Sequence, residues 1–241
     1  MTSKQTKRAR AKTRLKNFYL KVRALIGSIL ILGLASAASA LFFFVWLANK
    51  LLEGDTETFD EIIRDFAQEF AGETVTAVMN FVTVFGSTLF LSIVFLSIII
   101  IFIRQKRNRA AVLLTTTMTG AIILNFVLKI SFARARPVPF FETPLPDSYS
   151  FPSGHALFAA CFYGALAWLL AARTTNRALQ IGICSAAVLL ILLIGLSRIY
   201  LGVHYPSDVI AGFSAAIVWV STIILVDSII KNSNNLNKLR P

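Results

Sequence analysis

The chain has 241 residues, of which 56% are hydrophobic and 15% are charged, and its mean hydropathy is +0.70. This composition excludes an ordinary soluble domain with a polar surface and predicts an integral membrane protein. The formal net charge of +12 is explained by membrane topology and by contact with anionic lipid, so we expect no nucleic-acid partner.

Six stretches are long and apolar enough to cross a bilayer as helices, which takes about 20 residues each. In chain order they are Leu25–Ala48, Met79–Ile103, Ala110–Leu128, Ala156–Ala172, Ala178–Leu196 and Val209–Val226. They predict an all-α, polytopic membrane protein with six transmembrane helices. We expect a basic segment at 1–24, a membrane domain at 25–230 and a tail at 231–241.

Within the first stretch, ASAASA at 35–40 resembles a signal-peptidase site. The apolar run continues beyond it as LFFFVWLA, which gives a length suited to spanning. We therefore expect the segment to be retained as a transmembrane helix.

The segment between the first two stretches has a different pattern. In DTETFDEIIRDFAQEF, apolar residues recur at helical spacing with carboxylates between them. The apolar residues are Phe59, Ile62, Ile63, Phe66 and Phe70. The pattern predicts an amphipathic helix at about 57–72, lying at the outer membrane interface. Its role is either interfacial packing, the commoner one, or gating of a site.

Lys and Arg are concentrated before the first stretch, between the second and third, between the fourth and fifth, and after the sixth. With six spans these four segments share one side, and the positive-inside rule makes that side cytoplasmic. We therefore expect a multi-pass cell-membrane protein with both termini in the cytoplasm. The extracytoplasmic side then receives Glu53–Glu73, Lys129–His155 and Ser197–Asp208.

Three polar motifs lie on that extracytoplasmic side, at span ends, where charge is costly unless it has a function. They are KISFARARP, PSGH and SRIYLGVHYPSD. Lys129, Arg136 and Arg198 would place three cations in one pocket, where they repel one another unless an anion with several oxygens lies between them. A phosphate group meets that requirement.

PSGH leads into the N-terminus of a helix, where unpaired backbone N–H groups and the helix dipole favour an anion. Ser153 would offer a hydroxyl, and Gly154 would let the backbone approach closely. For an isolated PSGH, a simple helix cap at Ser153 is an equally good interpretation. The neighbouring cations favour phosphate binding.

The only two histidines fall on this same side. Asp208 follows His204 by four residues, so its carboxylate is placed to accept the proton of one ring nitrogen and leave the other as a nucleophile. His155 is then free to protonate a leaving oxygen. Two histidines and a carboxylate also suit zinc, but a metal among three cations is electrostatically unfavourable. We expect no metal and no cofactor.

These motifs resemble the three motifs of the type 2 phosphatidic acid phosphatase superfamily. With six expected spans, the chain is similar to the integral-membrane lipid phosphatases of that superfamily, which include the bacterial phosphatidylglycerophosphatase and undecaprenyl-diphosphatase types. The matching patterns are Lys, six residues, Arg-Pro; Pro-Ser-Gly-His; and Ser-Arg, five residues, His, three residues, Asp. The resemblance implies a metal-independent lipid phosphatase or diphosphatase. It implies attack by His204, oriented by Asp208, and leaving-group protonation by His155. The phosphate-binding residues that it implies are Lys129, Arg136, Ser153, Gly154 and Arg198.

The substrate stays open among undecaprenyl diphosphate, phosphatidylglycerophosphate and phosphatidate. A transporter of an anionic lipid or phosphate is the alternative function. It would need charged or broken helices at the bilayer midplane, and the expected spans have none. No sequence pattern defines an oligomeric state.

Overall fold

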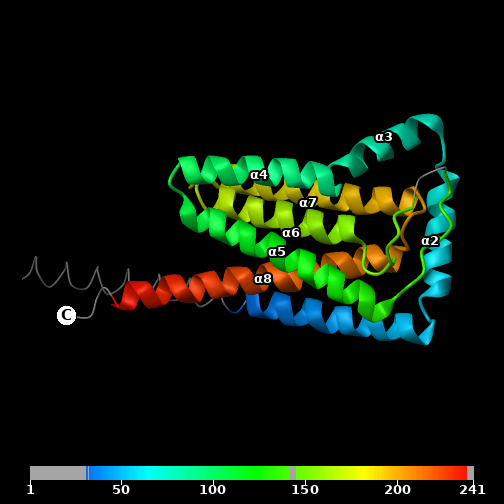
Figure 1. Cartoon of the computed structure of the whole chain (residues 1–241), viewed down its shortest axis with the longest axis horizontal. Coiled ribbons are helices and arrows are strands. Elements are labelled where there is room, and N and C mark those ends of the chain that lie inside the picture. The colour runs from blue at the N-terminus through cyan, green and yellow to red at the C-terminus, as the bar shows by residue number, and fades with distance from the viewer. Residues whose placement is uncertain (1–30, 32, 142–144, 238–241) are drawn as a thin grey trace, which may run out of the picture.

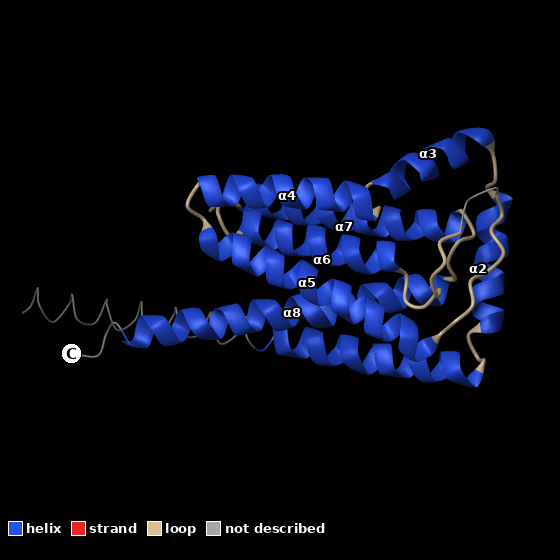
Figure 2. Ribbon diagram, viewed as in Figure 1, coloured by secondary structure: helices blue, strands red, loops and turns tan. Residues whose placement is uncertain are grey.

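The computed structural model describes residues 31, 33–141 and 145–237, and all regular secondary structure within these ranges is helical (Figure 2). The helix Gly33–Glu53 precedes the labelled helices in the chain. The remaining helices are α2 (Glu57–Glu69), α3 (Glu73–Val84), α4 (Thr88–Arg104), α5 (Asn108–Phe132), α6 (Gly154–Ala171), α7 (Arg177–Tyr200) and α8 (Pro206–Asn237).

Five helices are long and apolar enough to cross a membrane: Gly33–Glu53, α5, α6, α7 and the Pro206–Ser233 part of α8. The expected span Met79–Ile103 is not one continuous helix. It is divided between α3 and α4, which are bent by 43° and make a sixth span if the pair is counted as one.

The break follows from two local features. Ser87 caps α4, because its Oγ accepts a hydrogen bond from Phe90 N at 3.3 Å. At Gly86 a Cβ would stand only 2.5 Å from Ile194 Cγ2, so the backbone approaches α7 more closely than any side chain would permit.

The ends of the expected spans differ from the helices by a few residues. The start of the first span and the basic segment 1–24 lie outside the described residues, and Gly33–Glu53 extends beyond Ala48. α8 continues to Asn237, past residue 230, where we expected the tail to begin. The division into 1–24, 25–230 and 231–241 stays a prediction.

The helices lie side by side along the long axis, and α2 crosses one end of them (Figure 1). Because lipid tails are as apolar as the side chains, close packing through small residues holds such a bundle together. Gly120 on α5 provides this packing, since a Cβ there would overlap the ring of Trp219 at 2.0 Å. Trp219 Nε1 also donates to Thr117 O at 2.9 Å, which joins α8 to α5.

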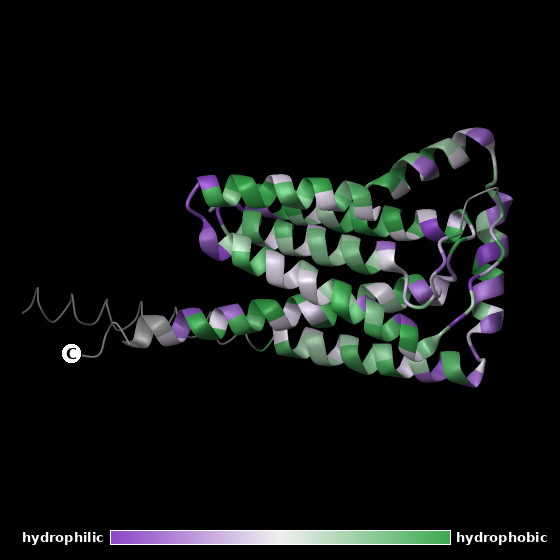
Figure 3. Ribbon diagram, viewed as in Figure 1, coloured by the Kyte–Doolittle hydropathy of each residue, from purple (hydrophilic) through white to green (hydrophobic). Residues whose placement is uncertain are grey.

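Polar residues gather at the two ends of the bundle, while the helix surfaces between them are apolar (Figure 3). The α4–α5 and α6–α7 turns, which contain the basic RQKRNR and RTTNR segments, lie at one end. α2 lies at the other end, together with the segments that carry the three polar motifs (Figure 1). This arrangement matches the grouping of loops expected from charge.

α2 ends at Glu69 and is therefore shorter than the expected helix at 57–72. One face of the helix is buried against the bundle and another is exposed. Phe59, Ile62 and Phe66 are exposed, whereas Asp60 and Ala67 are buried. Ile63 packs in an apolar cluster with Ala156, Ile199 and Val209 at the ends of α6, α7 and α8.

Candidate active site

Two hydrogen bonds, one between backbone groups and one from a side chain to the backbone, bring the three polar motifs together at the α2 end of the bundle. Ser153 N, at the start of α6, donates to Asp208 O at 3.0 Å, at the start of α8. Arg136, in the segment after α5, donates through Nη1 to Val203 O at 3.0 Å. The α5–α6 segment and the α7–α8 connection are therefore in direct contact.

The connection from α7 to α8 is shaped by Gly202. Its φ of +71° lies in the left-handed region, and a Cβ there would stand 2.6 Å from Phe140 N. Only glycine fits such a turn without strain. The turn delivers His204 two residues before Pro206, which begins α8 at the position where proline is favoured.

His204 is 2% exposed, and its two ring nitrogens have different partners. Nδ1 lies 3.3 Å from Asp208 Oδ2, and Nε2 lies 3.1 Å from Arg136 Nη1. A guanidinium can only donate, so Nε2 is the acceptor and the ring proton is on Nδ1, facing Asp208. The lone pair of His204 is thus on Nε2, where it accepts a hydrogen bond from Arg136.

Burial lowers the pKa of His204 to about 4. The hydrogen bond and the charge of Asp208 oppose this decrease in pKa, whereas the charges of Arg136 and Arg198 add to it. The sequence left the direction of this shift open, because a carboxylate and nearby cations act in opposite senses. In the structure the imidazole is neutral at pH 7, which is the form that a nucleophile requires.

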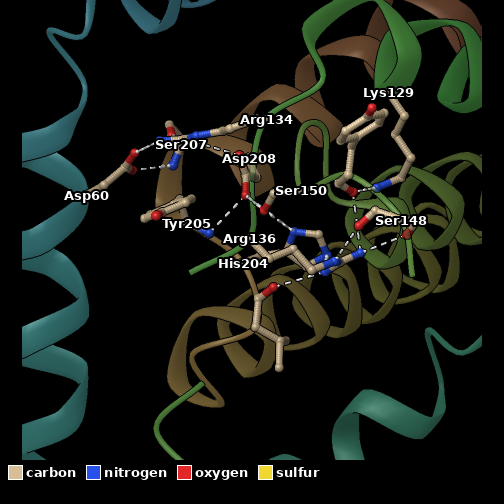
Figure 4. A network of polar contacts seen from close by, with 12 residues as sticks. Asp60, Lys129, Arg134, Arg136, Ser148, Ser150, His204, Tyr205, Ser207 and Asp208 are labelled. Atoms are coloured by element: carbon tan, nitrogen blue, oxygen red, sulfur yellow. Dashed lines mark hydrogen bonds and ion pairs between the residues drawn. The ribbon is translucent and has the colours of Figure 1, made fainter. Parts of the chain in front are cut away.

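The Asp208 carboxylate has partners on both of its oxygens. Oδ2 accepts from Ser150 Oγ at 2.5 Å and from Tyr205 N at 3.0 Å, in addition to facing His204 (Figure 4). Oδ1 accepts from Arg134 Nη1 at 2.6 Å. Its orientation is fixed by these four groups.

The three predicted phosphate-binding cations are held by neighbouring oxygen atoms. Lys129 Nζ donates to Tyr149 O, and Arg136 Nε donates to Ser148 O at 2.7 Å. Burial lowers the pKa of Arg136, and the charge of Asp208 opposes the shift. Arg198 Nη1 donates to Thr83 Oγ1 of α3 at 2.6 Å.

Several buried polar atoms near these cations have no hydrogen-bond partner among the described residues. They are Ser153 Oγ, Arg198 Nε and Asn125 Oδ1. Ser153 occupies the N-cap position of α6, but its side chain makes no capping bond. The simple-cap interpretation is therefore wrong for its hydroxyl, and an anion bound here would satisfy the two donors.

Gly154 and His155 begin α6. A Cβ on Gly154 would stand 3.5 Å from Phe158 and 3.6 Å from Asn125 Oδ1, which are ordinary contacts, so the protein itself leaves room for a side chain there. The His155 ring packs against Gly86, where a Cβ would be 3.2 Å from its Cδ2. No hydrogen bond joins this ring to another described residue, so its proton is not committed to a structural partner.

The sequence did not single out Arg134, Ser150 or Asp60. Arg134 precedes Arg136 by two residues in the RARP segment, and that spacing was the available signal. Burial by itself lowers the pKa of Arg134, but the charges and hydrogen bonds of Asp208 and Asp60 outweigh it and raise the pKa above its usual value. Asp60 was one carboxylate among several in its helix, and nothing in the pattern marked it as buried.

Within the described ranges no group of three or more His, Cys, Asp or Glu residues is placed to hold a metal ion. What the site does contain is a neutral imidazole with an oriented lone pair, a buried carboxylate on its opposite nitrogen, and cations with unused donors. This combination suits nucleophilic attack on a phosphorus atom whose oxygens are bound by the cations.

Comparison with known proteins gives a consistent result. The model of the PAP2 superfamily matches residues 110–229. Phosphatidylglycerophosphatase B of Bacillus subtilis is 32% identical over 184 residues, which cover 75% of this chain and 89% of that protein. Undecaprenyl-diphosphatase of Sulfolobus acidocaldarius is 33% identical over 61% of this chain and 68% of its own length.

A solved structure is also similar. The crystal structure of a transmembrane PAP2 type phosphatidylglycerolphosphate phosphatase from Bacillus subtilis superposes with a TM-score of 0.75 and 28% identity. The match covers 81% of this chain and 97% of that one.

Proposed function

The chain belongs to the PAP2 superfamily and is a lipid phosphatase, and we propose that it acts through a phosphohistidine formed on His204. The observation that carries this proposal is the setting of the His204 ring, with Nδ1 facing Asp208 and Nε2 facing Arg136. The transporter alternative is set aside, because the relatives are phosphatases.

In the first step the lipid phosphate lies among Lys129, Arg136 and Arg198, with Ser153 Oγ donating to one of its oxygens. His204 Nε2 attacks phosphorus, a P–N bond forms, and the P–O bond to the lipid breaks. The leaving oxygen takes a proton from His155. Asp208 stabilises the positive charge that the His204 ring gains, through the hydrogen bond from Nδ1.

In the second step water attacks the phosphohistidine. His155, now neutral, takes a proton from this water, the P–N bond breaks, and inorganic phosphate leaves. His204 returns to its neutral form. The cations supply the charge neutralisation that a divalent metal supplies in other phosphatases, so we propose that turnover needs no metal ion.

For the arrangement in the membrane, we propose six spans with α3 and α4 counted as one, an extracytoplasmic site and cytoplasmic termini. The basic RQKRNR and RTTNR turns at the opposite end of the bundle support this orientation. α2 would then lie at the outer interface with its exposed Phe59, Ile62, Phe66 and Phe70 toward lipid.

For the substrate, we propose phosphatidylglycerophosphate. The support is that the Bacillus subtilis phosphatidylglycerophosphatase B is matched over 89% of its length, against 68% for the undecaprenyl-diphosphatase. Undecaprenyl diphosphate and phosphatidate are the competing head groups.

The test is phosphate release by the purified protein from these three lipids in matched detergent micelles, with excess chelator present. The proposal predicts turnover in chelator, inhibition by vanadate, and the highest kcat/KM with phosphatidylglycerophosphate. A higher kcat/KM with another lipid would reassign the substrate. Loss of all activity in chelator, restored by added metal, would overturn the metal-independent mechanism.

A further inference from the structure

α2 is connected to the candidate active site through a buried carboxylate. Asp60 is 0% exposed. Its Oδ1 accepts from Ser207 N at 2.8 Å, and its Oδ2 accepts from Ser207 Oγ at 2.6 Å and from Arg134 Nη2 at 2.7 Å. The Arg134 guanidinium also lies over the Tyr205 ring, 3.9 Å from its centroid. Figure 4 shows this network between α2 and the start of α8.

Arg134 is shared by two buried carboxylates that belong to different parts of the fold. Its Nη2 binds Asp60 on α2, and its Nη1 binds Asp208 Oδ1 at 2.6 Å. Asp60 and Asp208 both have fully buried side chains. A buried carboxylate is strongly unfavourable without a paired cation. The planar fork of one arginine donates to both carboxylates and offsets part of their charge.

The division of the Asp208 oxygens has a chemical consequence. Arg134 occupies Oδ1, and this leaves Oδ2 to face His204 Nδ1, with Ser150 Oγ and Tyr205 N as its further donors. If Arg134 moved, Oδ1 would lose its charged donor and only the groups on Oδ2 would still orient the carboxylate, so the Nδ1 proton of His204 would be held less firmly.

α2 has other contacts with the bundle besides the ion pairs that connect Asp60 to Asp208 through Arg134. Arg64, also on α2, donates to Val138 O at 2.8 Å and lies over the Phe140 ring, 4.7 Å from its centroid. Ile63 and Ala67 pack in an apolar cluster at the ends of α6, α7 and α8. These contacts hold α2 against the bundle without touching Asp208 itself, while Arg64 also lies over the Tyr205 ring, 5.3 Å from its centroid.

We propose that Arg134 is a positioning residue of the active site and that Asp60 holds it in place, so that α2 sets the orientation of Asp208 and, through it, the tautomer of His204. The inference rests on the proposed function, in which His204 is the nucleophile. It gives α2 a part in catalysis that is separate from any contact of this helix with lipid.

The test uses Asp60→Asn in the full-length protein, with single-turnover formation of phosphohistidine, steady-state kcat and KM, and vanadate inhibition as readouts. The asparagine oxygen can still accept from Ser207 N, so α2 keeps a contact, but the charge that holds Arg134 is gone. We expect kcat and the rate of phosphohistidine formation to fall by about tenfold or more, by analogy with the loss of a residue that orients a metal-binding side chain. KM and vanadate inhibition should stay at the wild-type values.

Arg134→Lys provides a second route to the same answer if Asp60→Asn does not fold. It keeps the positive charge but cannot reach both carboxylates with a rigid fork, so the same loss of kcat without a change in KM is expected. Asp65→Asn is the matched control, because Asp65 is an exposed carboxylate on the same helix and lies outside the network that joins Asp60 to Asp208. It should leave kcat, KM and the rate of phosphohistidine formation unchanged.

The two ways of failing are distinct. If wild-type protein hydrolyses the lipid without forming phosphohistidine on His204, the proposed mechanism is wrong, whatever the variants do. If wild-type protein forms it, and Asp60→Asn and Arg134→Lys form it at the wild-type rate with only a lower Tm, α2 is a structural brace and the positioning role is refuted.

Discussion

At the scale of single residues, the chemistry depends on which proton each nitrogen of His204 carries. The sequence placed Asp208 one helical turn after His204, and this spacing was enough to predict that the two side chains meet. It did not predict that Ser150 and Arg134 also hold the carboxylate, because both come from a segment without regular structure. Nor did it predict that Asp60, more than 140 positions before Asp208, holds Arg134. Such contacts depend on tertiary packing, which local spacing does not encode.

Asp208→Asn is expected to lower kcat by about 10²- to 10⁴-fold while vanadate still binds. The asparagine amide can donate to Nδ1, which would move the ring proton to Nε2 and block attack. Steady-state kinetics and vanadate inhibition measure the two effects separately. Asp227→Asn is the control, because Asp227 is paired with Arg109 instead, at 2.5 Å, and should leave kcat unchanged. Loss of vanadate binding in Asp208→Asn would contradict a purely orienting role.

The pKa of His204 also predicts how stability varies with pH. Its value of about 4 in the folded protein is below the ordinary value of about 6.5. As pH falls through this window the unfolded chain binds a proton that the native protein does not, so the free energy of unfolding decreases. The full loss from this group, reached below about pH 4, is about 3 kcal/mol.

The measurement is Tm in detergent micelles at pH values across this window, for wild type and for His204→Gln. The variant lacks the imidazole, so its Tm should fall less than that of the wild type as the pH is lowered. Equal decreases in the two proteins would mean that His204 titrates with an ordinary pKa in the folded state.

At the scale of helices, hydropathy predicted where most spans lie and misjudged one of them. An apolar run of the right length looks the same whether it forms one helix or two, so Met79–Ile103 was expected to be continuous. Besides the Ser87 cap, the division depends on the close contact of Gly86 with α6 and α7, which the apolar run itself does not record. It also brings Thr83 of α3 to Arg198, a contact that the sequence analysis did not anticipate.

Gly86→Ala tests the importance of this break. The added Cβ would meet Ile194 Cγ2 at 2.5 Å and His155 Cδ2 at 3.2 Å, so we expect a loss of stability of about 1–3 kcal/mol and lower activity as His155 is displaced. Gly164→Ala on α6 is the control, since nothing lies within 4 Å of a Cβ at that position. Thermal unfolding and phosphate release give both readouts. Wild-type behaviour of Gly86→Ala would show that the neighbours adapt at no cost.

At the scale of the whole molecule, charge predicted which loops share an end, because the positive-inside rule constrains topology before any packing is considered. The structure groups the loops in that way, and the proposed orientation places the α2 end outside the cell.

A cysteine in place of exposed Asp147, near the candidate site, should react with an impermeant maleimide in intact cells when the native cysteines are replaced by serine. A cysteine in place of exposed Thr175, in the α6–α7 turn, should react only after lysis. The reverse pattern would invert the orientation and leave the chemistry unaffected.

The central claim is that His204 becomes phosphorylated during turnover, and trapping the intermediate tests it most directly. Purified protein is quenched with base, because phosphohistidine is labile to acid, during turnover of a lipid carrying labelled phosphate, and the adduct is mapped by mass spectrometry. We predict label on His204 in the wild type, none in His204→Ala, and label retained on His204 when His155→Ala is given a substrate with a good leaving group such as a nitrophenolate. A phosphoryl group on His155, or normal turnover by His204→Ala, would contradict the account.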